Sequence, residues 1–217
     1  MTQDTYYATR YVFDSNRTVV WKEIVKFLQK YVQAGETVLD LGAGYCDFIN
    51  NIEAEKKYAV DVSPELEKYA GENVKKINSP AWDLSLVQDG SVDVVFASNL
   101  LEHLADDELQ KTMKEITRVL KPKGKLILMQ PNYRLSKKHY FDDPTHKKIF
   151  DDISLRDFLL LHGFKILLKM PRFLPLSMRS NSSLVPNFLL PIIVRFYIHS
   201  PIKPFAGQML FVTEIKK

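Results

Sequence analysis

Cysteine is almost absent from this sequence of 217 residues, in which Cys46 is the only one. No disulfide can therefore form within the chain, which is typical of proteins in a reducing compartment, and we expect a cytoplasmic protein. The sequence also lacks any run of about 18 apolar, uncharged residues, so we expect no transmembrane helix. The N-terminal stretch MTQDTYYATR has no apolar core, and we expect no signal peptide.

Neither charge nor repetition indicates a nucleic-acid-binding protein. The chain has 30 basic and 26 acidic residues with a formal net charge of +4, and the basic residues form no long stripe. The hydrophobic fraction of 46% is that of an ordinary globular protein, and there is no internal repeat. We therefore predict a single domain over residues 1–217 that does not bind nucleic acid.

A glycine is missing from the one nucleotide-binding motif that we find in the chain. Residues 42–47 read GAGYCD, whereas the dinucleotide fingerprint G-x-G-x-x-G needs a third glycine so that helix and strand can pack closely around a pyrophosphate. Asp47 occupies the third position and is a poor neighbour for a diphosphate, and Cys46 stands beside it where a further glycine is expected. The motif thus disfavours an NAD-linked oxidoreductase and favours a cationic ligand without phosphates.

The residues around this motif predict a strand, a glycine turn, a helix and a second strand. The apolar run before the turn leads into Gly42 and Gly44, which let the chain bend sharply and approach a ligand, and a helix is expected over 47–54. Asp61 ends the second apolar run, where a carboxylate can accept hydrogen bonds from both hydroxyls of a ribose. We interpret residues 37–62 as a nucleoside-binding βαβ unit.

The sequence VLDLGAG, with the acid that follows it, resembles the class I S-adenosylmethionine-dependent methyltransferases of the small-molecule type, the methyltransferase-11-like group. The resemblance covers roughly residues 35–170 and implies S-adenosylmethionine as the cofactor. It also implies that a carboxylate after the third strand accepts a hydrogen bond from the adenine amino group. Asp83 matches that position, with Trp82 and Leu84 beside it, although Asp83 could instead cap a turn.

Cofactor contacts are also expected at the end of the fourth strand. Ser98 and Asn99 come directly after the apolar run VDVVFA, and the carboxyl ends of parallel strands face the ligand crevice. We expect these two residues to contact the methionine end of the cofactor or the acceptor. The predicted cofactor-binding residues are Asp40, Gly42, Ala43, Gly44, Asp61, Val62, Trp82, Asp83, Leu84, Ser98 and Asn99.

The remaining pattern predicts a fold of the α/β class. We expect a doubly wound, seven-stranded Rossmann-like sheet, mostly parallel with an antiparallel last strand, and helices on both faces. Apolar runs at 164–170 and 208–215 would form the last two strands, and residues 1–34 would form an N-terminal helical cap. The tyrosines of this cap that could fold over the site are Tyr6, Tyr7 and Tyr11.

Two histidines are candidates for a general base, which methyl transfer requires only when the acceptor is a hydroxyl or a protonated amine. His103 follows the fourth strand on the ligand side, and His146 lies in a long polar loop where the nearby Asp143 could orient its imidazole. Either histidine could instead be structural. Some RNA-end methyltransferases of this superfamily bind a metal through a Glu-x-x-Glu-His segment and a later histidine. Asn99 replaces the first glutamate here, so we predict no metal site.

Acidic residues are missing altogether from Phe158 to Thr213. Within this region the apolar and basic segment 171–207 separates the last two predicted strands, where a tight hairpin would suffice. Three interpretations stay open for this insertion: a lid over the acceptor pocket, a peripheral membrane contact through 171–205, or a homodimer interface.

Together these features predict an enzyme that transfers a methyl group from S-adenosylmethionine to a small-molecule acceptor. The basic, acid-free insertion favours oxygen on an anionic sugar, a glycan precursor or a lipid-linked metabolite. The alternative is a regulatory or scaffold protein that binds the cofactor without turnover. Amino-methylation of DNA is disfavoured, because no Asn-Pro-Pro-Tyr type segment follows the fourth strand.

Overall fold

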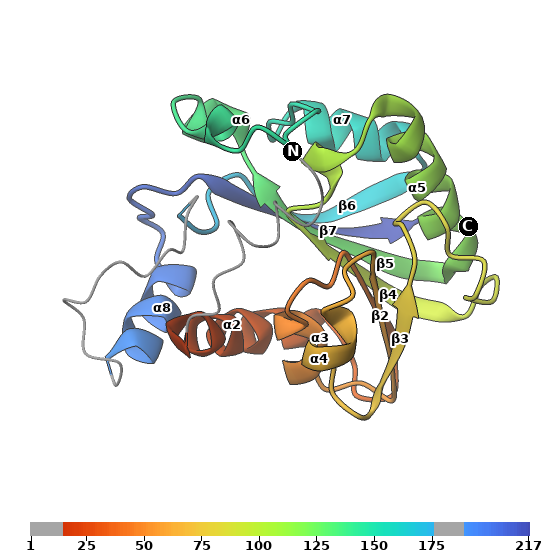
Figure 1. The fold of residues 1–217 in the computed structure, drawn as a ribbon. Coiled ribbons are helices and arrows are strands. Elements are labelled where there is room, and N and C mark those ends of the chain that lie inside the picture. Colours follow the sequence, from red (N-terminus) through yellow and green to blue (C-terminus); the bar gives the residue numbers. More distant parts are fainter. Residues whose placement is uncertain (1–14, 176–188) are drawn as a thin grey trace.

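The computed structural model of the chain describes residues 15–175 and 189–217. A seven-stranded sheet with the order β3-β2-β1-β4-β5-β7-β6 forms its centre (Figure 1). Four neighbouring pairs, β1–β2, β1–β4, β2–β3 and β4–β5, are parallel, whereas β7 runs antiparallel to both β5 and β6. The strands are β1 (Thr37–Leu41), β2 (Lys56–Asp61), β3 (Val74–Asn78), β4 (Val92–Ser98), β5 (Leu120–Pro131), β6 (Phe164–Met170) and β7 (Gln208–Ile215). The predicted sheet, with its antiparallel last strand, is confirmed.

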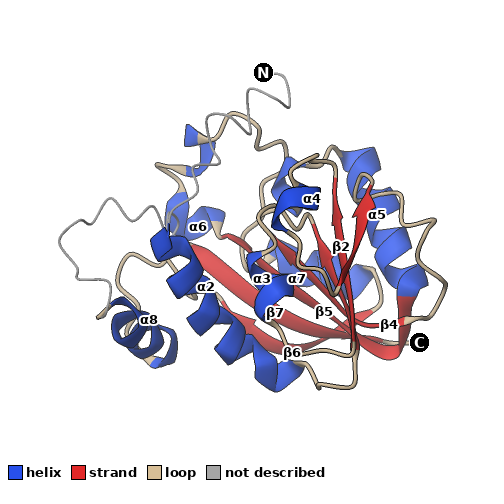
Figure 2. Cartoon of the chain, turned by 60° about the horizontal axis from the view of Figure 1, so that its bottom comes forward, coloured by secondary structure: helices blue, strands red, loops and turns tan. Residues whose placement is uncertain are grey.

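Helices cover both faces of the sheet, and each face has its own apolar core (Figure 1, Figure 2). One core is completed by α5 (Asp106–Val119) and α7 (Ser154–Leu161). The other is completed by α2 (Ser15–Leu28), α3 (Asp47–Asn51), α4 (Leu66–Tyr69) and α8 (Leu190–His199). A short helix, α6 (Tyr133–Ser136), follows β5, and three 3-10 turns complete the described elements: η1 (Gln29–Tyr31), η2 (Leu101–His103) and η3 (Tyr140–Asp142).

The strand sequences explain why two cores form. On β1, Val38 packs in one core and the next residue, Leu39, packs in the other, and Val94 and Val95 divide in the same way on β4. Successive side chains of a strand point to opposite faces of the sheet. A parallel strand buried on both faces therefore reads as a continuous apolar run, which is the pattern seen in the sequence.

The helix after the glycine turn is shorter than predicted, because α3 ends at Asn51 and does not reach residue 54. The side chain of Gln29 accounts for the difference. Its Oε1 accepts from the amide of Glu53 at 2.9 Å and its Nε2 donates to the carbonyl of Glu53 at 3.0 Å. Both backbone groups of Glu53 are thus bound outside the helix, and the chain leaves toward β2.

Only part of the predicted N-terminal cap falls within the described residues. Its helix, α2, packs against the sheet with Ile24 and Leu28 fully buried, whereas Tyr6, Tyr7 and Tyr11 lie outside the described residues. Across 15–175 and 189–217, each helix is too short or too polar to cross a bilayer.

Candidate functional site

The turn between β1 and α3 needs glycine for both its conformation and its space. Gly42 and Gly44 have φ values of +71° and +52°, in the left-handed region that favours glycine. The amides of Gly42 and Ala43 donate to the carbonyl of Val60 at 2.8 and 3.1 Å, which ties the turn to β2. A Cβ added to Gly42 would lie 3.0 Å from Cδ1 of Leu100. A side chain at this position would therefore be strained by the backbone conformation, and it would also push the Leu100 side chain aside by a few tenths of an ångström.

Asp61 ends β2 beside this turn and is only 7% exposed. Its Oδ2 accepts from the amide of Gly44 at 2.8 Å, and its Oδ1 accepts from the amide of Ser63 at 2.8 Å. A carboxylate oxygen can accept more than one hydrogen bond, which is what contact with a ribose hydroxyl requires. The next residue, Val62, is 37% exposed and offers apolar surface next to the carboxylate.

Two further acids surround the turn. Asp40 is buried, and desolvation together with the charge of Asp61 raises its pKa well above the usual range. Asp47, at the third-glycine position, is 9% exposed and accepts from Nε of Arg17 at 2.6 Å. Burial raises the pKa of Asp47, and the guanidinium of Arg17 opposes that shift. The sequence did not single out Arg17, because no local pattern links α2 to this turn.

The backbone conformation of Cys46 explains why a glycine was expected at this position. Its backbone is left-handed, with φ of 59° and ψ of 24°. Non-glycine residues adopt this conformation only occasionally. The side chain is fully buried, and burial raises the pKa of the thiol to about 12. The thiol therefore stays protonated and is a packing group, not a nucleophile.

Ser98 and Asn99 lie at the carboxyl end of β4, as predicted. Asn99 has φ of +49°, and its amide donates to the carbonyl of Met129 at 2.8 Å. Nδ2 of Asn99 donates to Oγ of Ser98 at 3.3 Å, and Oδ1 accepts from Nε2 of Gln208 at 3.3 Å. Gln208 is 5% exposed, and among the described residues its Oε1 has no hydrogen-bond partner. It is a polar group of this end of the sheet that the sequence pattern did not indicate.

The predicted adenine-binding segment follows β3. Asp83 is exposed, and its Oδ1 accepts from the amide of Ser85 at 3.1 Å. Hydrogen bonds from the side chain and from the amide of Ser85 lower the pKa of Asp83. This is the turn-capping arrangement that was the alternative for this residue. Trp82 is half-buried against the core, and the side chain of Leu84 is fully buried in it. Asp83 caps the turn with Oδ1. It can therefore cap the turn and also contact a ligand through Oδ2.

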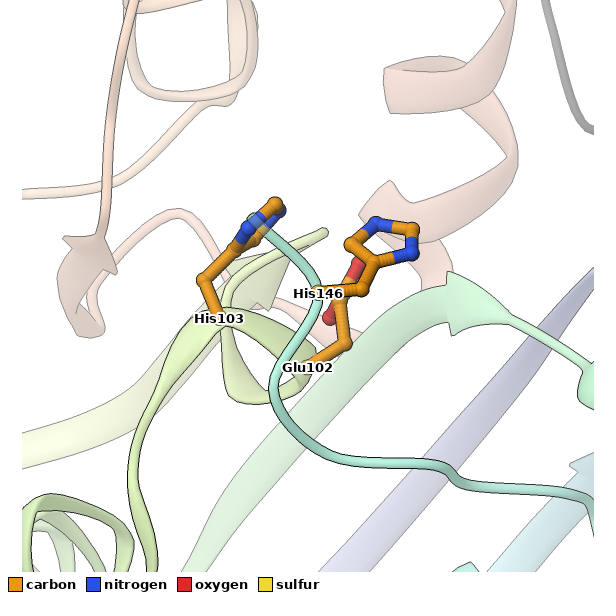
Figure 3. Close-up of side chains that lie close together, drawn as sticks. All are labelled: Glu102, His103 and His146. Atoms are coloured by element: carbon orange, nitrogen blue, oxygen red, sulfur yellow. The ribbon is translucent and has the colours of Figure 1, made fainter. Parts of the chain in front are cut away.

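The predicted catalytic residues His103, His146 and Asp143 come together in space. The two imidazole rings lie 4.8 Å apart between centroids (Figure 3). Nδ1 of His103 lies 2.9 Å from Oγ1 of Thr145, which lies 2.6 Å from Oδ1 of Asp143. Asp143 thus orients His103 through Thr145, whereas the sequence had suggested that it acts on His146. Burial and the neighbouring His146 lower the pKa of His103 to about 4, so its ring is neutral near pH 7.

Glu102 lies beneath these histidines and was not among the predicted residues (Figure 3). It is fully buried, and burial raises its pKa to about 8. One ligand atom from each of Glu102, His103 and His146 lies within 4.8 Å of the others. Asn99, which replaces the first glutamate of the metal-binding segment, bonds to Ser98 instead. His146 approaches the Glu-His pair from a loop far along the chain, which the local sequence could not indicate.

The described part of the insertion packs against α2. Ile198 of α8 is buried in the same core, and the His199 ring lies 5.6 Å from that of Phe27. Nζ of Lys203 donates to the carbonyls of Tyr197 and Ile198 at 3.0 and 2.7 Å, which caps the end of α8. The other side of this segment exposes large apolar side chains: Ile192, Ile193, Phe196, Ile202 and Phe205.

Comparison with known proteins supports a methyltransferase. A family model described as a methyltransferase domain matches residues 39–128. Phosphoethanolamine N-methyltransferase 1 of Triticum aestivum is 28% identical over 153 residues, and this match spans 62% of the chain but only 30% of the wheat protein. An uncharacterised protein of Methanocaldococcus jannaschii is 30% identical over 207 residues, which cover 92% of the chain and 87% of that protein.

A solved structure shares the fold along nearly the whole chain. The SAM-dependent methyltransferase of Archaeoglobus fulgidus superposes with a TM-score of 0.65 at 19% identity, and the match covers 97% of both chains. The glycine turn, the acid that ends β2 and the matched domain lie in the same part of the chain. Residues 39–128 therefore form a methyltransferase domain, and the fold of the chain is that of a SAM-dependent methyltransferase.

Proposed function

We propose that this protein transfers the methyl group of S-adenosylmethionine to a small anionic acceptor at the carboxyl end of the sheet. The observation that carries the proposal is the carboxylate of Asp61, which the amides of Gly44 and Ser63 hold beside the glycine turn. A carboxylate at this point suits the hydroxyls of a ribose. The same carboxylate suits a sulfonium cation better than a pyrophosphate, because like charges repel.

The other cofactor contacts are assigned by their position around this carboxylate. Asp83 and Trp82 contact the adenine from the loop after β3, and the exposed Val62 packs on the ring. Ser98 and Asn99 take the methionine end of the cofactor at the end of β4. The exposure of Val62 and Asp83 supports this assignment, because both side chains are accessible to a ligand.

The main requirement of the reaction is that the protein aligns the methyl donor with the acceptor. Methyl transfer from a sulfonium is an in-line displacement whose leaving group is already activated. Holding donor and acceptor in line supplies roughly 7–11 kcal/mol of the barrier. A hydroxyl acceptor must also lose its proton, and the neutral, oriented His103 is our candidate for handling it.

An anionic acceptor fits the charge at this end of the molecule. A surface hollow beyond the carboxyl end of β5 is lined by Asn132, Arg134, Asp152 and Arg172. Asp152 pairs with Lys169 at 2.7 Å and with Arg134 at 3.5 Å, which leaves the hollow with an excess of positive charge. We assign oxygen on an anionic sugar, a glycan precursor or a lipid-linked metabolite as the first candidate acceptor.

Methyl transfer to nitrogen is the second candidate. It is favoured by the match to phosphoethanolamine N-methyltransferase 1, which spans 62% of this chain. An amino alcohol phosphate carries an amine and an anionic group, so it belongs to the same charge class as the first candidate.

The proposal is tested by following methyl transfer from isotopically labelled S-adenosylmethionine to a panel of small acceptors. The panel pairs phosphorylated sugars and amino alcohols with their unphosphorylated forms, and calorimetry measures cofactor binding in the same preparation. We expect label on phosphorylated acceptors and little on their neutral counterparts. Cofactor binding with no transfer to any acceptor would favour the regulatory alternative. Preferential labelling of neutral acceptors would refute the anionic class.

A further inference from the structure

Three side chains that commonly bind metals converge beside the cofactor turn. Glu102 and His103 lie in η2, directly after β4, and His146 reaches them from the loop that follows β5 (Figure 3). The backbone holds this loop in place, because the amides of Lys147 and Lys148 donate to the carbonyl of Glu102 at 2.8 and 3.0 Å. The cluster is therefore preorganised by main-chain bonds and does not depend on two mobile side chains meeting.

The hydrogen bonds of the two histidines determine which nitrogen carries the proton. Nδ1 of His146 lies 2.6 Å from the carbonyl of Tyr140, which can only accept, so Nδ1 of His146 is the protonated nitrogen. The Thr145 hydroxyl donates its one hydrogen to the carboxylate of Asp143 at 2.6 Å. It must therefore accept from Nδ1 of His103 at 2.9 Å. Both rings thus carry their lone pair on Nε2.

This arrangement is typical of histidines that bind metals. Such a histidine usually donates its other ring N–H to a carbonyl or to a carboxylate, which fixes the tautomer and the orientation of the ring. Here Tyr140 serves His146 directly, and Asp143 serves His103 through Thr145. Each imidazole therefore has the outer partner that a metal ligand requires.

The burial of Glu102 is separate evidence for a bound cation. Its side chain is 0% exposed, and among the described residues neither carboxylate oxygen has a hydrogen-bond partner. A buried carboxylate without a partner destabilises the folded protein, whether it stays charged or takes up a proton. A cation between Glu102 and the two Nε2 atoms would remove this destabilisation, since it would pair with the carboxylate.

We propose that Glu102, His103 and His146 bind a divalent transition-metal ion. Metal–ligand bonds of about 2.1 Å place two ligands of a tetrahedral site roughly 3.4 Å apart. One oxygen of Glu102 and one nitrogen of each ring now lie within 4.8 Å of one another, so the three side chains move closer when the ion binds. Two imidazoles and one carboxylate suit Zn²⁺, Fe²⁺ or Mn²⁺ better than Ca²⁺. Such a set leaves at least one coordination position open.

The open position gives the ion a role in binding the acceptor, and this step rests on the proposed function. Leu100, two residues before Glu102, packs against Gly42 of the cofactor turn, so the cluster lies next to the cofactor site. An anionic acceptor would bind the ion through an oxygen atom. The ion would then position that acceptor toward the methyl group and lower the pKa of a bound hydroxyl. In that case the ion replaces His103 as the group that assists deprotonation, because the lone pair of His103 binds the ion.

Metal binding is tested on the full chain, separately from turnover. The protein is treated with a chelator, dialysed, and titrated with Zn²⁺ and with Mn²⁺ by calorimetry, and elemental analysis gives the metal content. We expect a single ion per chain, and more than about tenfold weaker binding in Glu102→Gln, His103→Ala and His146→Ala. His139→Ala is the matched control, because His139 is an exposed histidine paired with Asp142 at 2.9 Å in the same loop.

Circular dichroism and S-adenosylhomocysteine affinity show whether each variant is still folded. If the chelated wild-type protein binds neither ion, or if the three variants bind as tightly as His139→Ala, the metal site is refuted. Labelled methyl transfer is measured with and without chelator in the same samples. If the protein binds no metal and the chelator does not affect transfer, the metal site is refuted and the proposed function stands. If the protein binds the metal but transfers no methyl group to any acceptor, the metal site stands and the proposed function is refuted.

Discussion

The Thr145 hydroxyl donates to Asp143 and accepts from His103, so a single hydrogen atom determines which His103 nitrogen is protonated. Valine has nearly the shape of threonine but can do neither. We expect Thr145→Val to weaken binding of the ion by about 10–100-fold, the usual effect of losing an outer partner of a metal ligand. S-adenosylhomocysteine affinity should stay within a few-fold, because the hydrogen bonds of Thr145 go to Asp143 and His103. Calorimetric titration measures both.

Thr145→Ser is the control for this prediction. Serine keeps the hydroxyl and both hydrogen bonds, so this variant should bind the ion nearly as tightly as the wild type. If both variants lose affinity equally, the effect is one of packing and the proposed relay is wrong.

Arg17 and Asp47 form an ion pair beside the glycine turn. The carboxylate is nearly buried, and the guanidinium is its partner at 2.6 Å. Because Arg17 is 37% exposed, solvent screens the pair, and we expect Arg17→Met to lower the free energy of unfolding by about 1–3 kcal/mol. Without Arg17 the pKa of Asp47 rises further. The deficit should therefore be present near neutral pH and shrink in acid, where Asp47 is protonated in the folded and the unfolded states.

Urea denaturation at two pH values measures this effect, and the double variant Arg17→Met/Asp47→Asn separates its causes. Removing the buried charge together with its partner should recover most of the lost stability at neutral pH. No recovery in the double variant would mean that Arg17 stabilises the protein through its ring contacts with Trp21 and Tyr45 instead.

Residues of the site were predictable where their signal is local. Gly42, Gly44 and Asp61 belong to one βαβ unit whose spacing follows from the geometry of a turn and two strands. Arg17 and Gln208 were not predictable, because each reaches its partner across the fold, over 30 and 109 residues of chain. Such contacts depend on the order of the strands, which the spacing of apolar residues does not contain.

At the scale of elements, the strands were easier to predict than the helix ends. The strands buried on both faces stand out as continuous apolar runs, and β6 matches its predicted range of 164–170. The end of α3 could not be predicted, because it is set by Gln29, which binds Glu53 from a different element. A helix end fixed by a tertiary hydrogen bond has no signature in the helix sequence itself.

The insertion is the element whose role the sequence left most open. Its helix α8 buries one side against α2 and exposes Ile192 and Phe196, which are 62% and 78% exposed, in a segment without acidic residues. Apolar side chains beside basic ones are typical of peripheral membrane contacts. We propose that this face binds anionic bilayers, and we expect the protein to float with vesicles that contain an anionic lipid.

Phe196→Glu should reduce vesicle binding by about tenfold or more, since it removes a large apolar side chain and adds repulsion from the lipid. Leu161→Glu is the matched control on α7, where Leu161 is 86% exposed on another face. The wild type could instead fail to bind vesicles and have the mass of a dimer in solution. If Phe196→Glu then makes the protein monomeric, the homodimer interpretation replaces the membrane contact.

At the scale of the whole molecule, the strand order explains how one site gathers residues from the entire chain. The parallel strands β1, β2, β3 and β4 end at the same edge of the sheet, so the glycine turn, Asp61 and Asn99 meet there. The fold class was predictable because the apolar runs and the βαβ unit both indicate a parallel sheet. The convergence of Glu102 with His146 was not, because it depends on the path of the loop after β5.

The central claim is that the turn at Gly42 and Gly44, with Asp61, holds an adenosyl sulfonium and not a pyrophosphate. The most direct test is calorimetric titration of the wild type and of Asp61→Ala with S-adenosylhomocysteine and with NAD. We predict that the wild type binds S-adenosylhomocysteine and not NAD, and that Asp61→Ala binds it more than about tenfold more weakly while staying folded. Binding of NAD, or equal affinity of the two proteins for S-adenosylhomocysteine, would contradict the claim.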